Sequence, residues 1–265
     1  MVNGPGTSLI GGGMKITKLK KNWEIFGKTD ALWSVLTAPG KEGNKWKPDE
    51  FFETGRKEID DTLAYLSSLG FSVNRGNALD FGCGVGRLTQ AMAEHFQRVC
   101  GVDISEAMIE KAESFNRFGD VCRYCINTED NLPAFNNEEF DFVYSNIVLQ
   151  HMKPVYSKKY IVEFVRVLKK GGLLVFQLPS GRKRQSGFFR NLLRRIAPES
   201  LIDWLFHARI RLHSWLDGKP LMEMYSVNKK EVTKLFSNCE ILAIQDNNDG
   251  AASWISTKYF VRKSA

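Results

Sequence analysis

Apolar residues along the middle of the chain follow two alternating patterns. Short, continuous apolar runs are typical of strands that a sheet buries on both faces. Between these runs, apolar residues recur three or four positions apart, as at Leu88, Met92 and Phe96, which predicts amphipathic helices. The alternation predicts an α/β fold with a parallel sheet and helices on both of its faces. Strands are expected near 77–81, 98–103, 121–126, 140–145 and 172–178.

The sequence on either side of this core shows further helices and strands. A helix over 56–69 is expected to end at Gly70, because glycine readily adopts the left-handed conformation that ends a helix. A helix is expected to begin after Asn228, a residue type that caps helices well. Apolar runs near 239–246 and 254–262 predict the last two strands.

Two segments fall outside the alternation. Residues 15–55 are rich in Trp and Phe with broken periodicity, and we expect short helices and loops there that form an N-terminal cap. Residues 180–224 predict two amphipathic helices that interrupt the core as a lid. We therefore expect a single domain over 15–265, preceded by a disordered leader or tag over 1–14.

The segment Asp80-Phe81-Gly82-Cys83-Gly84-Val85-Gly86 joins the first expected strand to a helix. Three glycines at alternate positions allow the backbone to turn sharply and to approach a ligand closely. The N-terminus of the following helix presents unpaired N–H groups to that ligand. Asp103 ends the next expected strand, where a carboxylate can accept hydrogen bonds from both hydroxyls of a ribose. Two adjacent strand ends therefore predict a site for a cofactor that contains adenosine.

The spacing of these glycines narrows the choice of cofactor. Dinucleotide sites usually read G-x-G-x-x-G, whereas this loop reads G-x-G-x-G. Asp80, two residues before the first glycine, would repel a pyrophosphate but suits the ammonium of an amino acid. In these residues the chain resembles the class I S-adenosylmethionine-dependent methyltransferases. The segments 139–146 and 168–176 look like the fourth strand of that family and its fifth strand with the preceding glycine turn.

The resemblance implies a doubly wound, mostly parallel seven-stranded sheet with an antiparallel C-terminal strand. S-adenosylmethionine would be the cofactor and S-adenosylhomocysteine the product, with no metal. The N-terminal cap and the helical insertion after the fifth strand would reach the carboxyl edge of the sheet, where open α/β sheets bind ligands.

The resemblance also assigns roles to individual residues, which lie at or just after the ends of the first four expected strands. Candidates for the methionine part of the cofactor are Asp80, Gly82, Gly84 and Gly86. Candidates for the adenosine part are Asp103 at the ribose and Ile104, Met108, Thr128 and Glu129 at the adenine. Further candidates for cofactor contacts are Cys83, Arg87, Leu88 and Ser145.

Two residues have assignments that stay open. Arg56 is placed, as in several relatives, to hold the methionine carboxylate, because a guanidinium can bind a carboxylate through two hydrogen bonds. A solvated arginine on an amphipathic helix explains Arg56 equally well. His151 follows the fourth strand and is a candidate catalytic base, which methyl transfer needs only for weakly acidic acceptors. A packing or hydrogen-bonding role for His151 is the alternative.

The net charge of +7 comes mainly from the segment 180–220. We rank a small or acidic molecule first as the acceptor. The basic segment also allows a membrane-associated lipophilic acceptor, with peripheral contact between 182–211 and anionic lipids, and in third place an RNA. A nucleic acid is disfavoured, because Ser145-Asn146-Ile147-Val148 replaces the Asn/Asp-Pro-Pro-aromatic motif of amino-directed DNA methyltransferases. The oligomeric state has no signature in the sequence.

Two other classes of protein share parts of this pattern. A binding module without catalysis would carry the same glycine motif, and an NAD-dependent oxidoreductase would carry a related one. Aromatic cover over 23–52 favours an enzyme, because lids exclude water from a reaction. The five cysteines form no paired framework, which is typical of a reducing cytoplasm, and Cys122 and Cys125 are interpreted as ordinary buried thiols. No apolar run approaches the roughly 20 residues that cross a bilayer.

Overall fold

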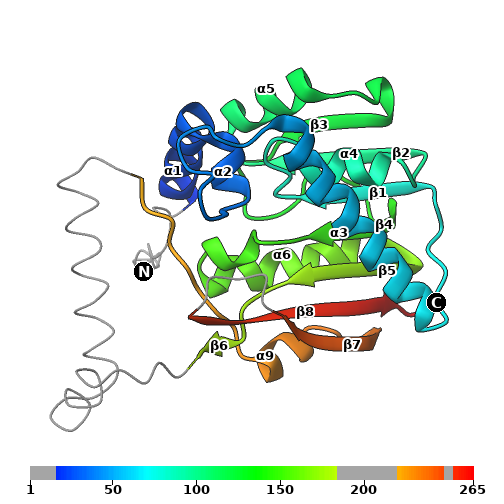
Figure 1. Ribbon diagram of the computed structural model, residues 1–265. Helices are drawn as coiled ribbons and strands as arrows, with labels where there is room; N and C mark the ends of the chain where they lie inside the picture. Colours follow the sequence, from blue (N-terminus) through cyan, green and yellow to red (C-terminus); the bar gives the residue numbers. More distant parts are fainter. Residues whose placement is uncertain (1–15, 184–219, 248–252) are drawn as a thin grey trace, which may run out of the picture.

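A computed structural model of the chain describes residues 16–183, 220–247 and 253–265. Within these residues one twisted sheet runs through the molecule in the order β3-β2-β1-β4-β5-β8-β6, and β7 pairs with β8 along the edge opposite β5 (Figure 1). The first five strands pair in parallel, and β8 runs antiparallel to β5, β6 and β7. The strands are β1 (Asn77–Phe81), β2 (Arg98–Asp103), β3 (Cys122–Ile126), β4 (Phe140–Ser145), β5 (Leu168–Gln177), β6 (Gly181–Arg182), β7 (Cys239–Asn247) and β8 (Trp254–Lys263).

This arrangement confirms the predicted fold class, a mostly parallel doubly wound sheet with an antiparallel C-terminal strand. One detail differs, since the sheet of the described residues has eight strands rather than seven. The extra strand is β6, a two-residue segment that pairs with the start of β8.

Helices cover both faces of the sheet and one of its edges. On one face α6 packs Tyr160 and Phe164 against the sheet, and on the other α3 packs Ile59 and Leu63. These apolar residues recur at helical spacing, which is why each helix buries a single stripe. The helices are α1 (Ile16–Thr29), α2 (Ala31–Val35), α3 (Pro48–Ser68), α4 (Arg87–Ala93), α5 (Glu106–Phe115), α6 (Pro154–Val167) and α9 (Lys229–Thr233), with short 3₁₀ turns η1 (Gly119–Val121) and η2 (Leu149–His151).

Two predicted boundaries are wrong, and both have local causes. The helix expected from residue 56 begins at Pro48, because proline suits the first helical position and Asp49 and Glu50 in the first turn favour the helix dipole. The strand expected from residue 172 begins at Leu168, directly after α6, and the pairing of β5 with β4 is irregular there. Two predicted helix signals are confirmed, since Gly70 has a φ of 83° after α3 and Asn228 caps α9.

The N-terminal segment forms helices that dock beside α5 (Figure 1). Phe26, Ala31 and Trp46 form a separate apolar cluster that includes Val85 of the glycine loop. A polar contact fixes α1 as well, since Glu24 Oε2 accepts hydrogen bonds from Ser105 Oγ at 2.9 Å and from the Ala107 N–H at 3.3 Å. These contacts hold α1 and α2 against the glycine loop and the start of α5.

The chain returns to the sheet through residues 220–227. The Val227 N–H donates to the carbonyl of Pro179 at 2.9 Å, and the Tyr225 N–H donates to the carbonyl of Gln150 at 2.7 Å. The predicted leader over 1–14 lies outside the described residues, and so do residues 184–219 of the lid predicted over 180–224. Nearly all of the segment 182–211, for which contact with lipids is predicted, is therefore outside them as well. Among the helices that are described, none is both long enough and apolar enough to span a bilayer.

Candidate functional site

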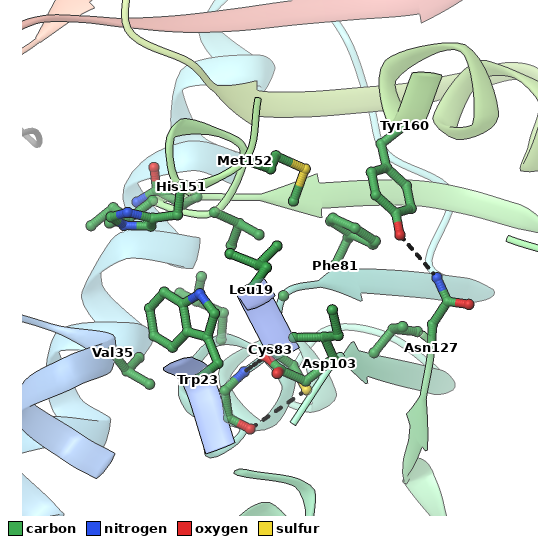
Figure 2. A pocket seen from close by; sticks show the side chains of 18 of the residues that line it. Leu19, Trp23, Val35, Phe81, Cys83, Asp103, Asn127, His151, Met152 and Tyr160 are labelled. Carbon is green, nitrogen blue, oxygen red and sulfur yellow. Dashed lines mark hydrogen bonds between the residues drawn. The ribbon is translucent and has the colours of Figure 1, made fainter. Parts of the chain in front are cut away.

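A cavity lies at the carboxyl ends of the parallel strands, where the sequence predicts a cofactor site (Figure 2). Its walls come from the glycine loop, the ends of the first four strands, and the helices α1, α2, α4 and α6. Apolar side chains of α1 and α2 close one side (Figure 2). The lining residues are Ile16, Leu19, Trp23, Val35, Phe81, Gly82, Cys83, Gly84, Arg87, Leu88, Val102, Asp103, Ile104, Asn127, Asn146, Ile147, Val148, His151, Met152, Tyr156 and Tyr160.

The glycine loop passes between two valine side chains. Gly82 has a φ of 76° and Gly84 a φ of 53°, values that residues with a Cβ rarely adopt. A Cβ on Gly82 would lie 2.3 Å from the side chain of Val148, and one on Gly84 would lie 2.4 Å from that of Val35. Both the backbone conformation and the close contacts therefore require glycine at these positions.

Asp103 ends β2 at the rim of the same loop. Its Oδ2 accepts a hydrogen bond from the Gly84 N–H at 2.9 Å, and its Oδ1 accepts one from the Ser105 N–H at 2.9 Å. Burial raises the pKa of Asp103, and these backbone hydrogen bonds oppose the rise. A carboxylate accepts about four hydrogen bonds in total, so both oxygens can bind further donors in the cavity.

Arg87 begins α4 and is held by a carboxylate from α3. Its Nη2 donates to Glu58 Oε2 at 2.8 Å, while Glu58 Oε1 accepts hydrogen bonds from Asn146 Nδ2 at 2.6 Å and from the hydroxyl of Tyr144 at 2.8 Å. Burial alone would raise the pKa of Glu58, but the cations Arg87 and Lys258 and these hydrogen bonds outweigh it and hold the pKa below its ordinary value. The Arg87 side chain is only 4% exposed, so this ion pair is largely shielded from solvent.

Two polar atoms of this cluster lack partners. Arg87 Nε, a donor, and Asn146 Oδ1, an acceptor, are both buried without a hydrogen bond in the described part of the chain. Both residues line the cavity. Since buried polar groups are nearly always satisfied, an unpartnered donor and an unpartnered acceptor on two lining residues favour a ligand with both a hydrogen-bond acceptor and a donor.

His151 lies in the cavity wall with both ring nitrogens engaged. Gln150 Oε1 accepts from Gln177 Nε2 at 3.2 Å, so the Gln150 amide nitrogen is left to donate to His151 Nε2 at 3.1 Å. Nδ1 then carries the proton and donates to the carbonyl of Glu223 at 2.8 Å. Burial lowers the pKa of His151 to about 4, against the opposing effect of the Glu223 carbonyl. The imidazole is therefore neutral near pH 7 and a weak base.

The cavity brings together many residues that the sequence singled out. All lie on the loop after β1, at the start of α4, at or just after the end of β2, or beyond β4. The candidates that line the cavity are Gly82, Cys83, Gly84, Arg87, Leu88, Asp103, Ile104 and His151.

Other candidates lie outside the lining. The structure contradicts the assignment of Arg56 to the methionine carboxylate, because Arg56 Nε donates to Glu94 at 2.9 Å and the side chain, which also pairs with Glu53, is 49% exposed. The solvated alternative for Arg56 agrees with this position. Thr128 and Glu129 are exposed beyond the end of β3, away from the cavity lining.

The remaining candidates lie next to the glycine loop or in the packing around it, outside the cavity lining. Asp80 is buried and accepts a hydrogen bond from Thr89 Oγ1 at 2.7 Å, and burial raises its pKa to about 7. Ser145 Oγ donates to the carbonyl of Phe81 at 3.0 Å, and Met108 packs in the apolar cluster under α1. Gly86 is the N-cap residue of α4 and has a φ of 82°. None of these four lines the cavity.

Several lining residues escaped the sequence prediction. Asn127, the first residue after β3, donates through Nδ2 to the hydroxyl of Tyr160 at 3.2 Å (Figure 2). Asn146 is the first residue after β4, so the rule that ligands bind at strand ends could have found both asparagines. Trp23 of α1 lies edge-on to His151, with ring centroids 5.4 Å apart (Figure 2). The sequence predicts an N-terminal cap at this edge of the sheet but does not single out any residue of α1 for the cavity wall.

Comparisons with known proteins find methyltransferases among the proteins similar to this chain. Residues 79–176 match the family of methyltransferase domains. Over 165 residues the chain is 27% identical to a ubiquinone biosynthesis O-methyltransferase of Idiomarina loihiensis, which covers 60% of this chain and 63% of that protein. Over 123 residues it is 27% identical to phosphoethanolamine N-methyltransferase 3 of Arabidopsis thaliana, covering 46% of this chain and 24% of that protein. The chain thus spans only part of the length of these curated relatives.

Solved structures show the same fold. Magnesium protoporphyrin IX methyltransferase of Synechocystis, solved with S-adenosylhomocysteine bound, superposes with a TM-score of 0.59 at 17% identity, covering 94% of this chain and 99% of that one. A methyltransferase of Clostridium acetobutylicum gives a TM-score of 0.53 at 16% identity, covering 81% of this chain and 92% of that one. Residues 79–176 therefore match a methyltransferase domain, and the glycine loop, the acidic residue at the end of β2 and the sheet order agree with the fold of the class I S-adenosylmethionine-dependent methyltransferases.

Proposed function

We propose that this chain transfers the methyl group of S-adenosylmethionine to a small-molecule acceptor. The observation that carries the proposal is the pair of buried, unpartnered polar atoms, Arg87 Nε and Asn146 Oδ1, on two residues of the cavity that Asp103 also lines. The amino-acid end of the cofactor carries a carboxylate, which needs a donor, and an ammonium, which needs an acceptor. Arg87 and Asn146 offer one of each.

The other end of the cavity suits adenosine. Asp103 keeps lone pairs for the ribose hydroxyls after its two backbone hydrogen bonds, and Gly84 brings the backbone close to the same carboxylate. Ile104 and Leu88 supply apolar contacts in the lining. The two ends together match a zwitterionic amino acid joined to a nucleoside.

S-adenosylmethionine supplies an activated methyl group on a sulfonium, which an acceptor lone pair attacks while the carbon–sulfur bond breaks and its electrons return to sulfur. The protein aligns acceptor and methyl and excludes water. Leu19, Trp23 and Met152 form an apolar wall for this purpose. We assign His151 a structural role, in which its ring packs against Trp23 and holds that wall in place. It is a poor candidate for a base, because both ring nitrogens form hydrogen bonds and its pKa of about 4 makes it a weak proton acceptor.

Relatives support a small acceptor. The names of the matched proteins refer to ubiquinone biosynthesis, phosphoethanolamine and magnesium protoporphyrin IX. These compounds differ in size and charge, so they support the class of small molecules without selecting one member.

Calorimetric titration of the full chain tests the cofactor assignment. We expect saturable binding of S-adenosylhomocysteine and none of NAD, and we expect Asp103→Asn to weaken that binding at least about tenfold through lost charge-assisted hydrogen bonds. Absence of S-adenosylhomocysteine binding by the folded chain would refute the proposed function.

A second ligand tests the amino-acid end separately. Methylthioadenosine lacks that end, so Arg87→Lys, which keeps a cation beside Glu58 but removes the Nε donor, should weaken S-adenosylhomocysteine about tenfold and leave methylthioadenosine within about twofold. The matched control Arg56→Lys, on the exposed face of α3, should change neither affinity. Equal weakening of both ligands by Arg87→Lys would show that Arg87 does not contact the amino-acid end.

A further inference from the structure

A second cavity adjoins the first and shares one wall with it. Both cavities are lined by Leu19, Trp23, His151, Met152 and Tyr156. The second cavity touches neither the glycine loop nor Asp103. A molecule held there therefore lies against the side chains that also line the first cavity, and it leaves the glycine loop and Asp103 free for the cofactor.

The other walls of the second cavity come from α1, the start of α6 and the returning segment at 221–225. Asn22 Nδ2 donates to the carbonyl of Leu221 at 3.0 Å, which fastens that segment to α1. The hydrogen bonds of Glu223 and Tyr225 to Gln150 and His151 join it to η2, which precedes α6. Hydrogen bonds thus hold the returning segment against α1 and against η2.

Apolar and charged groups are separated within this cavity. Leu19, Trp23 and Met152 form the shared wall, and Leu221 and Met222 add further apolar surface from the returning segment. Such a surface suits the apolar, ring-bearing body of a ligand.

The charged groups lie in the part that the first cavity does not share. Lys18, Lys153 and Glu223 line only the second cavity. Glu223 already accepts a hydrogen bond from the hydroxyl of Tyr225 at 2.6 Å and lies 3.8 Å from Lys18 Nζ. Lys153 is half-buried and forms no ion pair or hydrogen bond through Nζ in the described ranges. It also precedes the first turn of the fourteen-residue helix α6, whose N-terminal end is electropositive.

We propose that the second cavity holds the methyl acceptor, and that this acceptor is an amphipathic anion whose apolar body lies on the shared wall and whose anionic group lies at Lys153. The inference rests on the proposed function for the identity of the neighbouring cofactor. The proposal also indicates which part of the acceptor is methylated, because Lys153 lies outside the first cavity and an anionic group bound to it is held away from the cofactor. The methylated atom belongs to the body, and the anionic group itself is not methylated.

A matched pair of fluorescent probes tests the cavity without knowledge of the natural acceptor. 8-Anilinonaphthalene-1-sulfonate and N-phenyl-1-naphthylamine share one aromatic body, and only the first carries an anion. We would titrate both into the full chain with and without saturating S-adenosylhomocysteine. The anionic probe should bind in both conditions, because the two cavities are separate.

Lys153→Gln should weaken the anionic probe about fivefold, the upper range for a partly exposed charge pair, and should leave the neutral probe unchanged. Lys170→Gln is the matched control, since Lys170 is an exposed lysine of β5 outside both cavities. Leu221→Trp should weaken both probes by filling the cavity.

Three results would overturn the proposal. They are a lack of binding of the anionic probe, its displacement by S-adenosylhomocysteine, and equal losses in the two lysine variants. The titration with S-adenosylhomocysteine alone reports on the proposed function independently. If S-adenosylhomocysteine does not bind but Lys153→Gln still weakens the anionic probe, the proposed methyltransferase function is refuted. The second cavity would then be a site for an anion but not for a methyl acceptor.

Discussion

The carboxylate of Glu58 joins three elements of the fold, and its charge is the feature that we expect to matter most for stability. It pairs with Arg87 of α4, accepts hydrogen bonds from Tyr144 and Asn146 at the end of β4, and attracts Lys258 of β8. The variant Glu58→Gln keeps the shape of the side chain but removes the charge. The amide group then presents N–H donors to neighbours that are themselves donors.

The loss can be estimated from the burial of the partners. The side chain of Arg87 is 4% exposed and that of Glu58 is 18% exposed. Removal of one partner from such a pair leaves the other charge buried and uncompensated, which costs about 3 kcal/mol or more. The matched control is Glu53→Gln one turn earlier on α3, where the glutamate pairs with Arg56 and is 62% exposed. An exposed pair of this kind contributes less than about 1 kcal/mol.

Urea unfolding followed by circular dichroism measures both variants. We expect Glu58→Gln to lower the midpoint strongly with an unchanged slope, since the surface exposed on unfolding stays the same. Glu53→Gln should leave the midpoint almost unchanged. A loss for Glu58→Gln that is no larger than the loss for Glu53→Gln would refute the reasoning, because it would show that the buried charges relax or find other partners.

Two buried titrating groups give opposite pH dependences. Burial raises the pKa of Asp80 from 3.8 to about 7, so native protein retains a proton that the unfolded chain loses, and stability falls as pH rises through this interval. The free energy of unfolding of Asp80→Asn, measured relative to wild type, should therefore be about 2 kcal/mol higher at about pH 7 than at about pH 5.5. The same difference from wild type at both pH values would contradict a buried, protonated carboxyl. Burial lowers the pKa of His151 from 6.5 to about 4, so the unfolded chain takes up a proton first and stability falls as pH drops through this interval. In the same unfolding experiments, the free energy of unfolding of His151→Gln should decrease by about 3 kcal/mol less than that of wild type as pH drops. The same pH dependence in variant and wild type would show that the native imidazole titrates normally.

The sheet and the glycine loop were predictable because both depend on local sequence. Buried parallel strands appear as apolar runs, and the turn after β1 requires glycines that the chain displays at Gly82 and Gly84. Asp103 was predictable for the same reason, since it ends an apolar run at the known binding edge of the sheet.

The prediction for Arg56 failed because sequence spacing does not determine which way a helix faces. Gly55 packs against α4, where a Cβ would lie 2.5 Å from the carbonyl of Arg87. The next residue points about 100° away around the helix, so Arg56 faces solvent. Arg87 and Asn146 share Glu58 across long sequence separations, and only tertiary packing reveals that meeting.

The hydrogen bond between Val227 and Pro179 has a consequence for how this fold can vary. It joins the two ends of the stretch 180–226, the excursion, which follows β5, includes the short strand β6 and precedes α9, so the excursion begins and ends at one place on the domain. The entropy of closing such a loop grows slowly, by about 0.6 kcal/mol for each doubling of length. Descendants of this chain can therefore lengthen, shorten or exchange the excursion at little energetic cost to the sheet, and a new acceptor specificity can arise without a new scaffold.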